Sequence, residues 1–146
     1  MFKNILIPTD GSEQSQRAAQ FGVELARLHG ARVTGIHVIP DYHLLIAYEG
    51  AFDPVTEERI EEETKARAEA YLSYIREKAA AAGVQCSTAC ETSDHPYDAI
   101  LRTCESNGCD LILMTSHGRK GLAAVLLGSE TRKVLTHAKV PVLVVR

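Results

Sequence analysis

The chain has 146 residues, of which 45% are hydrophobic and 24% charged, and its formal net charge is −3. That length is typical of one domain and can bury a core without disulfide or metal staples, so we expect residues 1–146 to form a single domain. Lysine and arginine are not clustered on any predicted element, and binding to a nucleic acid backbone is therefore not expected.

The amino terminus leads directly into an apolar, strand-like segment and lacks the pattern of a signal peptide. No run reaches the roughly 18 apolar residues that a membrane-spanning helix needs. We therefore expect a cytoplasmic protein with no membrane partner. The acidic run over residues 57–63 is interpreted as the solvated start of a helix, where carboxylates suit the helix dipole.

The first two elements are a strand over residues 3–10 and a helix over residues 13–29. The strand contains the continuous apolar run ILI, which is typical of a strand buried on both faces. Ser12 is a suitable cap for the helix and Gly30 a suitable stop. Spacings of three and four predict an apolar helix face formed by Ala18, Phe21, Gly22, Leu25 and Leu28.

Strands and helices continue to alternate along the rest of the chain. The order strand–helix, repeated to a fifth strand, predicts an α/β fold with one doubly wound parallel sheet. The segment 41–54 is long for a connection and is typical of a lid or a partner surface. The later strands are predicted over 32–39, 84–91, 110–115 and 141–146, and the later helices over 55–82, 95–107 and 128–138.

The four cysteines are expected to be reduced thiols, because the chain shows no export signal. Cys86 and Cys90 fall on one face of a strand, about 13 Å apart at roughly 3.3 Å per residue, too far to pair or share a metal. Cys104 and Cys109 flank a helix end. We interpret all four as small buried hydrophobic residues, with a redox or zinc role as the alternative.

Three segments reach the carboxyl edge of the predicted sheet, where open α/β sheets bind ligands: residues 8–12, 38–40 and 115–129. In the third, Gly128 and Ser129 begin a helix, and free backbone N–H groups at a helix start bind anions. Arg119 and Lys120 add positive charge. The segment therefore favours a polyphosphate ligand, although an ordinary glycine-containing loop with a serine cap is the alternative.

Common catalytic and phosphate motifs are absent from the sequence. It contains no GxxxxGK[ST], no GxGxxG after the first strand and no GxSxG. No pair of residues has the pattern of a nucleophile and its base, and the histidines follow no metal-binding spacing. The pattern thus favours ligand binding over catalysis.

Four segments together resemble the universal stress protein family: ILIPTDGS, IHVI, LILMTSHGRKGL and LLGSETRKVLTHAKVPVLVV. The resemblance extends over the whole chain. It implies a five-stranded parallel sheet in the order 3-2-1-4-5 with helices on both faces, and a homodimer formed through the edge strand 141–146. An unpaired edge strand is chemically suited to such pairing.

One branch of that family binds ATP through the pattern G-x2-G-x9-G-[ST]. Gly118, Gly128 and Ser129 match it, whereas Thr115 replaces the first glycine. The resemblance implies a protein that binds ATP, or ADP or AMP, possibly with Mg²⁺, and that serves a stress or signalling role with little or no turnover. A slow ATPase and a nucleotide-free dimeric interaction module are the alternatives.

The resemblance also implies the residues of the nucleotide site. Asp10 is in addition a weak candidate for holding Mg²⁺, or simply a turn residue, and His117 either contacts the ligand or braces the loop. His37 is expected to be a satisfied residue of the core or switch point. The implied site comprises Pro8, Thr9, Asp10 and Val38 toward adenine and ribose; Met114, Thr115, Ser116, His117, Gly118 and Arg119 along the fourth strand and its loop; and Gly128, Ser129, Glu130 and Thr131 at the phosphates.

Overall fold

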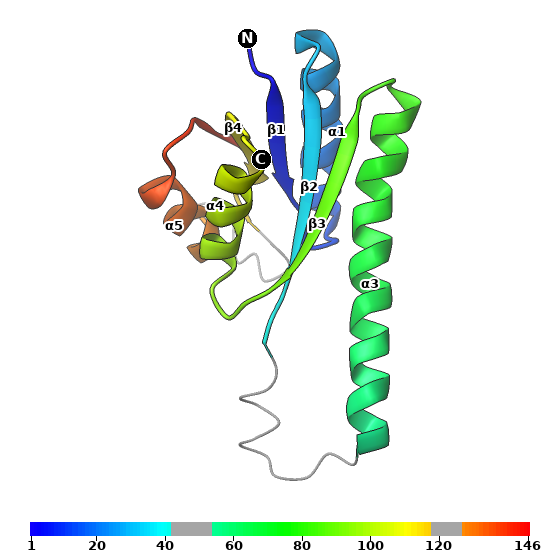
Figure 1. The fold of residues 1–146 in the computed structure, drawn as a ribbon. Helices are drawn as coiled ribbons and strands as arrows, with labels where there is room; N and C mark the ends of the chain where they lie inside the picture. Colours follow the sequence, from blue (N-terminus) through cyan, green and yellow to red (C-terminus); the bar gives the residue numbers. More distant parts are fainter. Residues whose placement is uncertain (42–53, 118–126) are drawn as a thin grey trace.

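The computed structural model describes residues 1–41, 54–117 and 127–146 (Figure 1). The expected lid or partner surface over residues 41–54 lies almost entirely outside this part of the chain. No helix among the described residues is long and apolar enough to span a membrane. The elements are β1 (Asn4–Pro8), α1 (Glu13–His29), β2 (Arg32–Ile39), α3 (Pro54–Ala81), β3 (Cys86–Thr92), α4 (Pro96–Ser106), β4 (Leu111–Thr115), α5 (Ser129–His137) and β5 (Val142–Val145).

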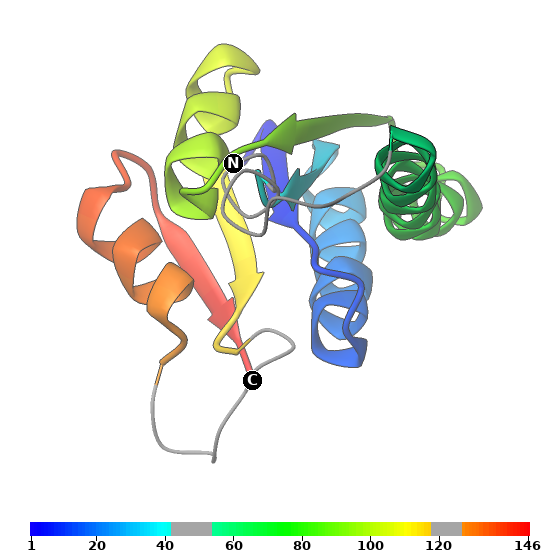
Figure 2. The same cartoon turned by 90° about the horizontal axis from the view of Figure 1, so that it is seen from below.

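The five strands form one parallel sheet in the order β3-β2-β1-β4-β5, as predicted. Figure 2 shows α1 and α3 on one face of the sheet and α4 and α5 on the other. Every predicted element is present, with bounds that agree within two residues. The alternation of apolar strands with periodic helices was therefore sufficient to predict the fold class, whereas the strand order was predicted from the family resemblance.

One apolar cluster lies on each face of the sheet, between the strands and the helices that cover that face. Ile5 and Ile7 of β1 point to the α1 and α3 side, whereas Leu6 points to the α4 and α5 side. Because side chains alternate along a strand, the run ILI supplies both clusters from the central strand. All three side chains are completely buried.

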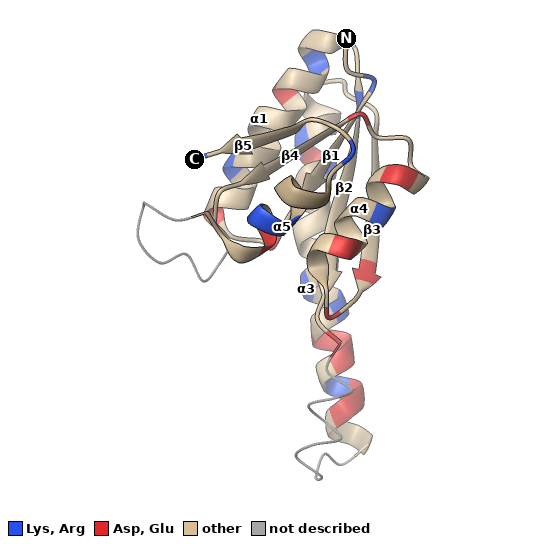
Figure 3. Ribbon diagram, turned by 90° about the vertical axis from the view of Figure 1, so that its left-hand side faces the viewer, with Lys and Arg blue, Asp and Glu red and all other residues tan. Residues whose placement is uncertain are grey.

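The acidic run at the start of α3 is solvated, as the charge pattern predicted. Figure 3 shows its acidic residues in red along the part of α3 that extends away from the sheet. Residues 57, 58 and 61–63 are exposed. Carboxylates in the first turns of a helix are favoured by the helix dipole, and Glu61 also pairs with Lys65 one turn later.

The predicted apolar face of α1 is wrong at two positions. Phe21 and Leu28 are 50% and 68% exposed, and the residues packed on the sheet are mostly small. At Gly22 a Cβ atom would lie 2.6 Å from Ile7 Cδ1, so the absence of a side chain lets the helix approach the sheet closely. Periodicity alone could not separate this stripe of small residues from the neighbouring stripe of large ones. The buried residues of α1 are Ser15, Ala18, Ala19, Gly22, Val23 and Ala26.

The prediction that all cysteines are buried is correct for Cys104 and Cys109 only. Cys86 is half-buried and Cys90 is exposed. Both lie on β3, an edge strand paired only with β2 among the described residues. A residue on an edge strand keeps part of its surface in solvent, so a cysteine there is less covered than one between a helix and the sheet.

We expect Leu113→Ala to lower the free energy of unfolding by about 2–5 kcal/mol, because it opens a cavity under α1 in a fully buried region. Leu28→Ala, at an exposed position of α1, should change it by no more than about 0.5 kcal/mol. Urea denaturation of both variants measures the difference. Equal destabilisation would show that the α1 face has been assigned wrongly.

Candidate functional site

The site lies where β1 and β4 separate at their carboxyl ends. The two strands pair through Ile5 with Leu111 and Leu6 with Ile112. Both continue beyond these pairs, to Pro8 and to Thr115, without further pairing to each other. The chain adds β2 and β3 on one side of β1, and β4 and β5 on the other side. The strand order therefore reverses between β1 and β4. Ligands of open α/β sheets bind outside the strand ends at such a point.

The turn after β1 is held by short side chains. The hydroxyl of Thr9 accepts a hydrogen bond from Gly11 N at 3.1 Å and lies 3.1 Å from Ser15 Oγ. One carboxylate oxygen of Asp10 accepts from Ser12 N at 2.9 Å, which is the hydrogen bond of an Asx turn. Ser12 in turn caps α1 by accepting from Ser15 N. Thr9 and Asp10 therefore shape the turn, whatever else they bind.

Tyr71 is a residue of this region whose position sequence reasoning did not identify. It comes from α3, far along the chain from the turn after β1. A Cβ atom on Gly11, which has a φ of 76°, would lie 2.2 Å from a Tyr71 ring carbon. The Tyr71 ring also meets the His37 ring edge-on, with 5.1 Å between centroids. Only the approach of α3 to the β1 turn creates this contact, and no local pattern signals it.

His37 is a satisfied residue at the switch point, as expected. Its Nδ1 lies 2.8 Å from the carbonyl oxygen of Thr9. Because a carbonyl can only accept, Nδ1 carries the proton in this hydrogen bond. The imidazole thereby ties β2 to the end of β1.

A backbone hydrogen bond joins the two ends of the loop that follows β4. Gly128 N donates to the carbonyl oxygen of Ser116 at 2.7 Å. A Cβ atom on Gly128 would lie 3.1 Å from that same oxygen, a backbone atom that cannot easily give way. Gly128 is the cap of α5 and has no side chain to bond the first N–H groups of the helix. The positive end of α5 is thus fixed beside the end of β4.

Two threonine hydroxyls brace the same junction. Thr131 Oγ1 donates to the carbonyl oxygen of Thr115 at 2.9 Å, and Thr115 Oγ1 donates to that of His117 at 2.7 Å. The hydroxyl that replaces the first glycine of the ATP pattern is therefore used within the loop. Thr131 is 4% exposed, so its hydroxyl is a buried link between α5 and the end of β4.

The carboxylate of Glu130 is engaged with α4. One oxygen accepts from the backbone N–H of Tyr97 at 2.8 Å, and the other pairs with Lys133 Nζ at 3.0 Å. His95, the cap of α4, makes no side-chain capping bond, so Glu130 supplies one from another helix. A phosphate at α5 would meet the backbone N–H of Glu130, since its side chain is negatively charged and occupied.

His117 has one nitrogen satisfied and one not. Its Nδ1 lies 3.0 Å from Ser116 Oγ, whereas Nε2 is buried and has no hydrogen-bond partner among the described residues. A buried polar atom without a partner costs about 1–3 kcal/mol, so such atoms often mark a ligand position. Both interpretations of His117 are thus compatible with the structure: Nδ1 braces the loop and Nε2 is available to a ligand.

Some of the remaining site residues belong to an apolar cluster beneath the sheet edge, and others lie outside the residues that the structure describes. Val38 is half-buried and Met114 is buried, and both belong to the cluster between the sheet and α4 with α5. Gly118 and Arg119 lie outside the described residues. No group of three or more potential metal ligands occurs among the residues that are described.

Comparison with known proteins identifies the family. The family model described as the universal stress protein family matches residues 1–146. A universal stress protein of Thermus aquaticus is 36% identical, and the alignment covers all of both chains. The universal stress protein MJ0577 of Methanocaldococcus jannaschii is 31% identical over the whole of this chain and 96% of its own.

Solved structures agree with this result. The structure of MJ0577 matches with a TM-score of 0.79, covering 99% of this chain and 96% of that one. Two more distant structures share the fold: a universal stress protein in complex with cAMP (23% identity, TM-score 0.71, 99% and 97% coverage) and one from Archaeoglobus fulgidus in complex with dAMP (22%, 0.63, 99% and 98%). The full-length family match and the identity to these relatives show that the chain belongs to the universal stress protein family.

Proposed function

We propose that this protein binds an adenine nucleotide (ATP, ADP or AMP) at the carboxyl ends of β1, β2 and β4. The observation that carries the proposal is the start of α5, which has no capping side chain and is held beside the end of β4 by the bond from Gly128 to Ser116. Backbone N–H groups and the helix dipole favour a phosphate there. Distant members with the same fold were solved with cAMP and dAMP, which are adenine nucleotides.

The described side chains suit the two ends of such a ligand. In this proposal Thr9, Asp10 and Val38 lie toward the adenine and ribose, and Nε2 of His117, which has no partner among the described residues, can bond a ribose or phosphate oxygen. Arg119, two residues after His117 in the sequence, supplies a positive charge for the phosphates. Mg²⁺ with a nucleotide usually takes one or two carboxylates, with phosphates and water as its other ligands, and Asp10 is the weak candidate for that carboxylate.

We further propose that the nucleotide serves a stress-response or signalling role in the cytoplasm with little or no turnover. A nucleotide that is bound and not consumed can report its own concentration by shifting the protein between states. Incubation of the protein with ATP and Mg²⁺ should release phosphate no faster than the Gly128→Val variant does. Steady release above that of the variant would establish a slow ATPase instead.

We expect freshly purified protein to release an adenine nucleotide on denaturation, and Gly128→Val to weaken ATP binding at least about tenfold. The variant places side-chain atoms against the carbonyl oxygen of Ser116, which displaces the start of α5. Mass spectrometry of the released molecules and calorimetry with ATP measure the two effects.

The matched control for this variant is Gly30→Ala. Gly30 has a φ of 64° and no atom within 4 Å of its Cβ position, so the change costs stability by backbone strain alone and is remote from the site. It should bind ATP as the natural chain does. An empty protein that also fails to bind ATP would favour the nucleotide-free interaction module.

We propose a homodimer formed through β5. This strand pairs only with β4 among the described residues, and Leu143 on it is 37% exposed. The carbonyl oxygens of Pro141 and Val145 accept from β4, so the backbone groups of Val142 and Val144 point to the open edge. An edge strand with free N–H and C=O groups is a template for a second strand.

Light scattering should give a mass of about twice the 16.0 kDa of one chain. Val144→Pro removes an outward N–H group without touching the bonds to β4, and should reduce the mass to that of a monomer. Leu28→Ala, on an exposed position of α1, is the control and should remain a dimer. A natural chain that is monomeric at micromolar concentration would exclude the dimer.

A further inference from the structure

Three helices of this protein end in the same way. α1, α3 and α4 are followed by Gly30, Gly83 and Gly108, all with positive φ. In each case the residue after the glycine donates its N–H to a carbonyl five residues earlier, which is the longer hydrogen bond of a Schellman motif. This motif places two side chains in contact. The pairs and their N···O distances are Ala31 with Ala26 (2.8 Å), Val84 with Ala79 (2.8 Å) and Cys109 with Cys104 (2.9 Å).

At α4 the contact is made by two thiols where the other helices use aliphatic side chains. Cys104 and Cys109 are 5% and 6% exposed. Cys104 Sγ lies 3.6 Å from the carbonyl oxygen of Cys109. The backbone bond and the side-chain contact therefore hold the pair close together, as a disulfide requires.

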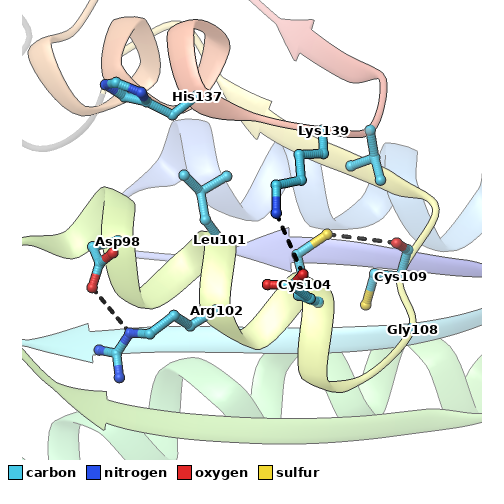
Figure 4. A pocket seen from close by; sticks show the side chains of 10 residues that line it. Asp98, Leu101, Arg102, Cys104, Gly108, Cys109, His137 and Lys139 are labelled. Carbon is cyan, nitrogen blue, oxygen red and sulfur yellow. Dashed lines mark hydrogen bonds and ion pairs between the residues drawn. The ribbon is translucent and has the colours of Figure 1, made fainter.

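Both cysteines line a cavity. It has a volume of about 440 Å³ and lies between α4 and the segment that joins α5 to β5 (Figure 4). Leu101 and Val140 form apolar walls beside the cysteines. Charged pairs stand around it, Arg102 with Asp98 at 3.0 Å and Lys139 with Glu105 at 3.5 Å. A small polar solute can thus approach the thiols without unfolding of the chain.

The two thiols differ in their acidity. A hydrogen bond from Cys104 lowers the pKa of Cys109, against the opposing effect of burial, with help from Thr34 and Arg32. The same hydrogen bond, followed by burial, raises the pKa of Cys104. Since the thiolate is the reactive form, the directions of these two shifts favour Cys109 over Cys104 as the attacking thiol.

The other two cysteines are the less reactive pair, although they are more exposed. Burial raises the pKa of Cys86. Burial, and after it the negative charges of Glu91 and Glu69, raise the pKa of Cys90. They therefore serve as internal references for any reagent that reaches the surface.

We propose that Cys104 and Cys109 form a redox-active dithiol site whose co-substrate is a small hydroperoxide. The Cys109 thiolate attacks one oxygen of hydrogen peroxide; the O–O bond breaks, hydroxide leaves and takes a proton to become water, and Cys109 becomes a sulfenic acid. The sulfur of Cys104 then attacks the Cys109 sulfur. The S–S bond forms, and the sulfenic oxygen leaves as water with the proton of Cys104.

This site is separate from the proposed nucleotide site. Cys109 precedes β4 by two residues, whereas the nucleotide site begins at the other end of the strand. Between Cys109 and β4 stands Asp110, whose carboxylate accepts from the backbone N–H groups of Lys3 and Asn4. A disulfide would therefore stiffen the segment that anchors the start of β1 to β4.

Peptide mapping of the reduced full-length protein tests the proposal. The protein is treated with about one equivalent of hydrogen peroxide, alkylated with N-ethylmaleimide in denaturant and digested with trypsin. Cys104 and Cys109 then share the peptide 103–119, and Cys86 and Cys90 share 79–102. We expect the first peptide to lose about 2 Da and resist alkylation until dithiothreitol is added, while the second is alkylated at both thiols.

Three variants separate the roles of the two thiols. Cys104→Ser should leave a sulfenic acid on Cys109, detected with dimedone, and Cys109→Ser should leave Cys104 unmodified at the same dose. The double variant Cys104→Ala, Cys109→Val copies the pair that ends α3 and should match the natural chain in thermal stability. If Cys86 or Cys90 is oxidised while Cys104 and Cys109 remain free thiols, the pair is only a capping contact and the proposal is wrong.

Discussion

The fold depends on burying β1 on both faces and along both edges. Ile5, Leu6 and Ile7 are completely buried, and β1 pairs with β2 on one side and β4 on the other. A strand in this position must end in the middle of the sheet's carboxyl edge. The turn that leaves it therefore arrives between the ends of β2 and β4, and the position of the candidate site is a consequence of the central strand.

Most polar groups that meet at this edge satisfy one another. The hydroxyls of Thr9, Thr115 and Thr131 and the Nδ1 atom of His37 bond neighbouring backbone or side-chain atoms. Such bonds hold the strand ends and the start of α5 in fixed positions before any ligand binds, which lowers the entropic cost of binding. Among the described residues, Nε2 of His117 has no hydrogen-bond partner and the first turn of α5 has no capping side chain, so these groups could bond the proposed ligand.

The sequence was sufficient to predict what depends on local pattern. Continuous apolar runs indicated buried strands, and capping residues gave helix bounds within two residues. Sequence reasoning failed where the packing of distant segments determines the position of a residue. Tyr71 reaches the β1 turn from α3, Glu130 caps α4 from α5, and Gly22 determines which stripe of α1 faces the sheet. None of these contacts has a signature in its own segment, because each depends on how two elements approach each other.

The ends of α1, α3 and α4 show how one structural position can accommodate different chemistry. The motif requires a glycine with positive φ and two small side chains in contact, and free cysteine packs as a small hydrophobic residue. Replacing an aliphatic pair by Cys104 and Cys109 therefore preserves the helix end while placing two thiols at neighbouring positions. At α1 and α3 the same contact is inert. At α4 the contact lies against a cavity. The helix end therefore tolerates two cysteines at a place where a solute can approach them.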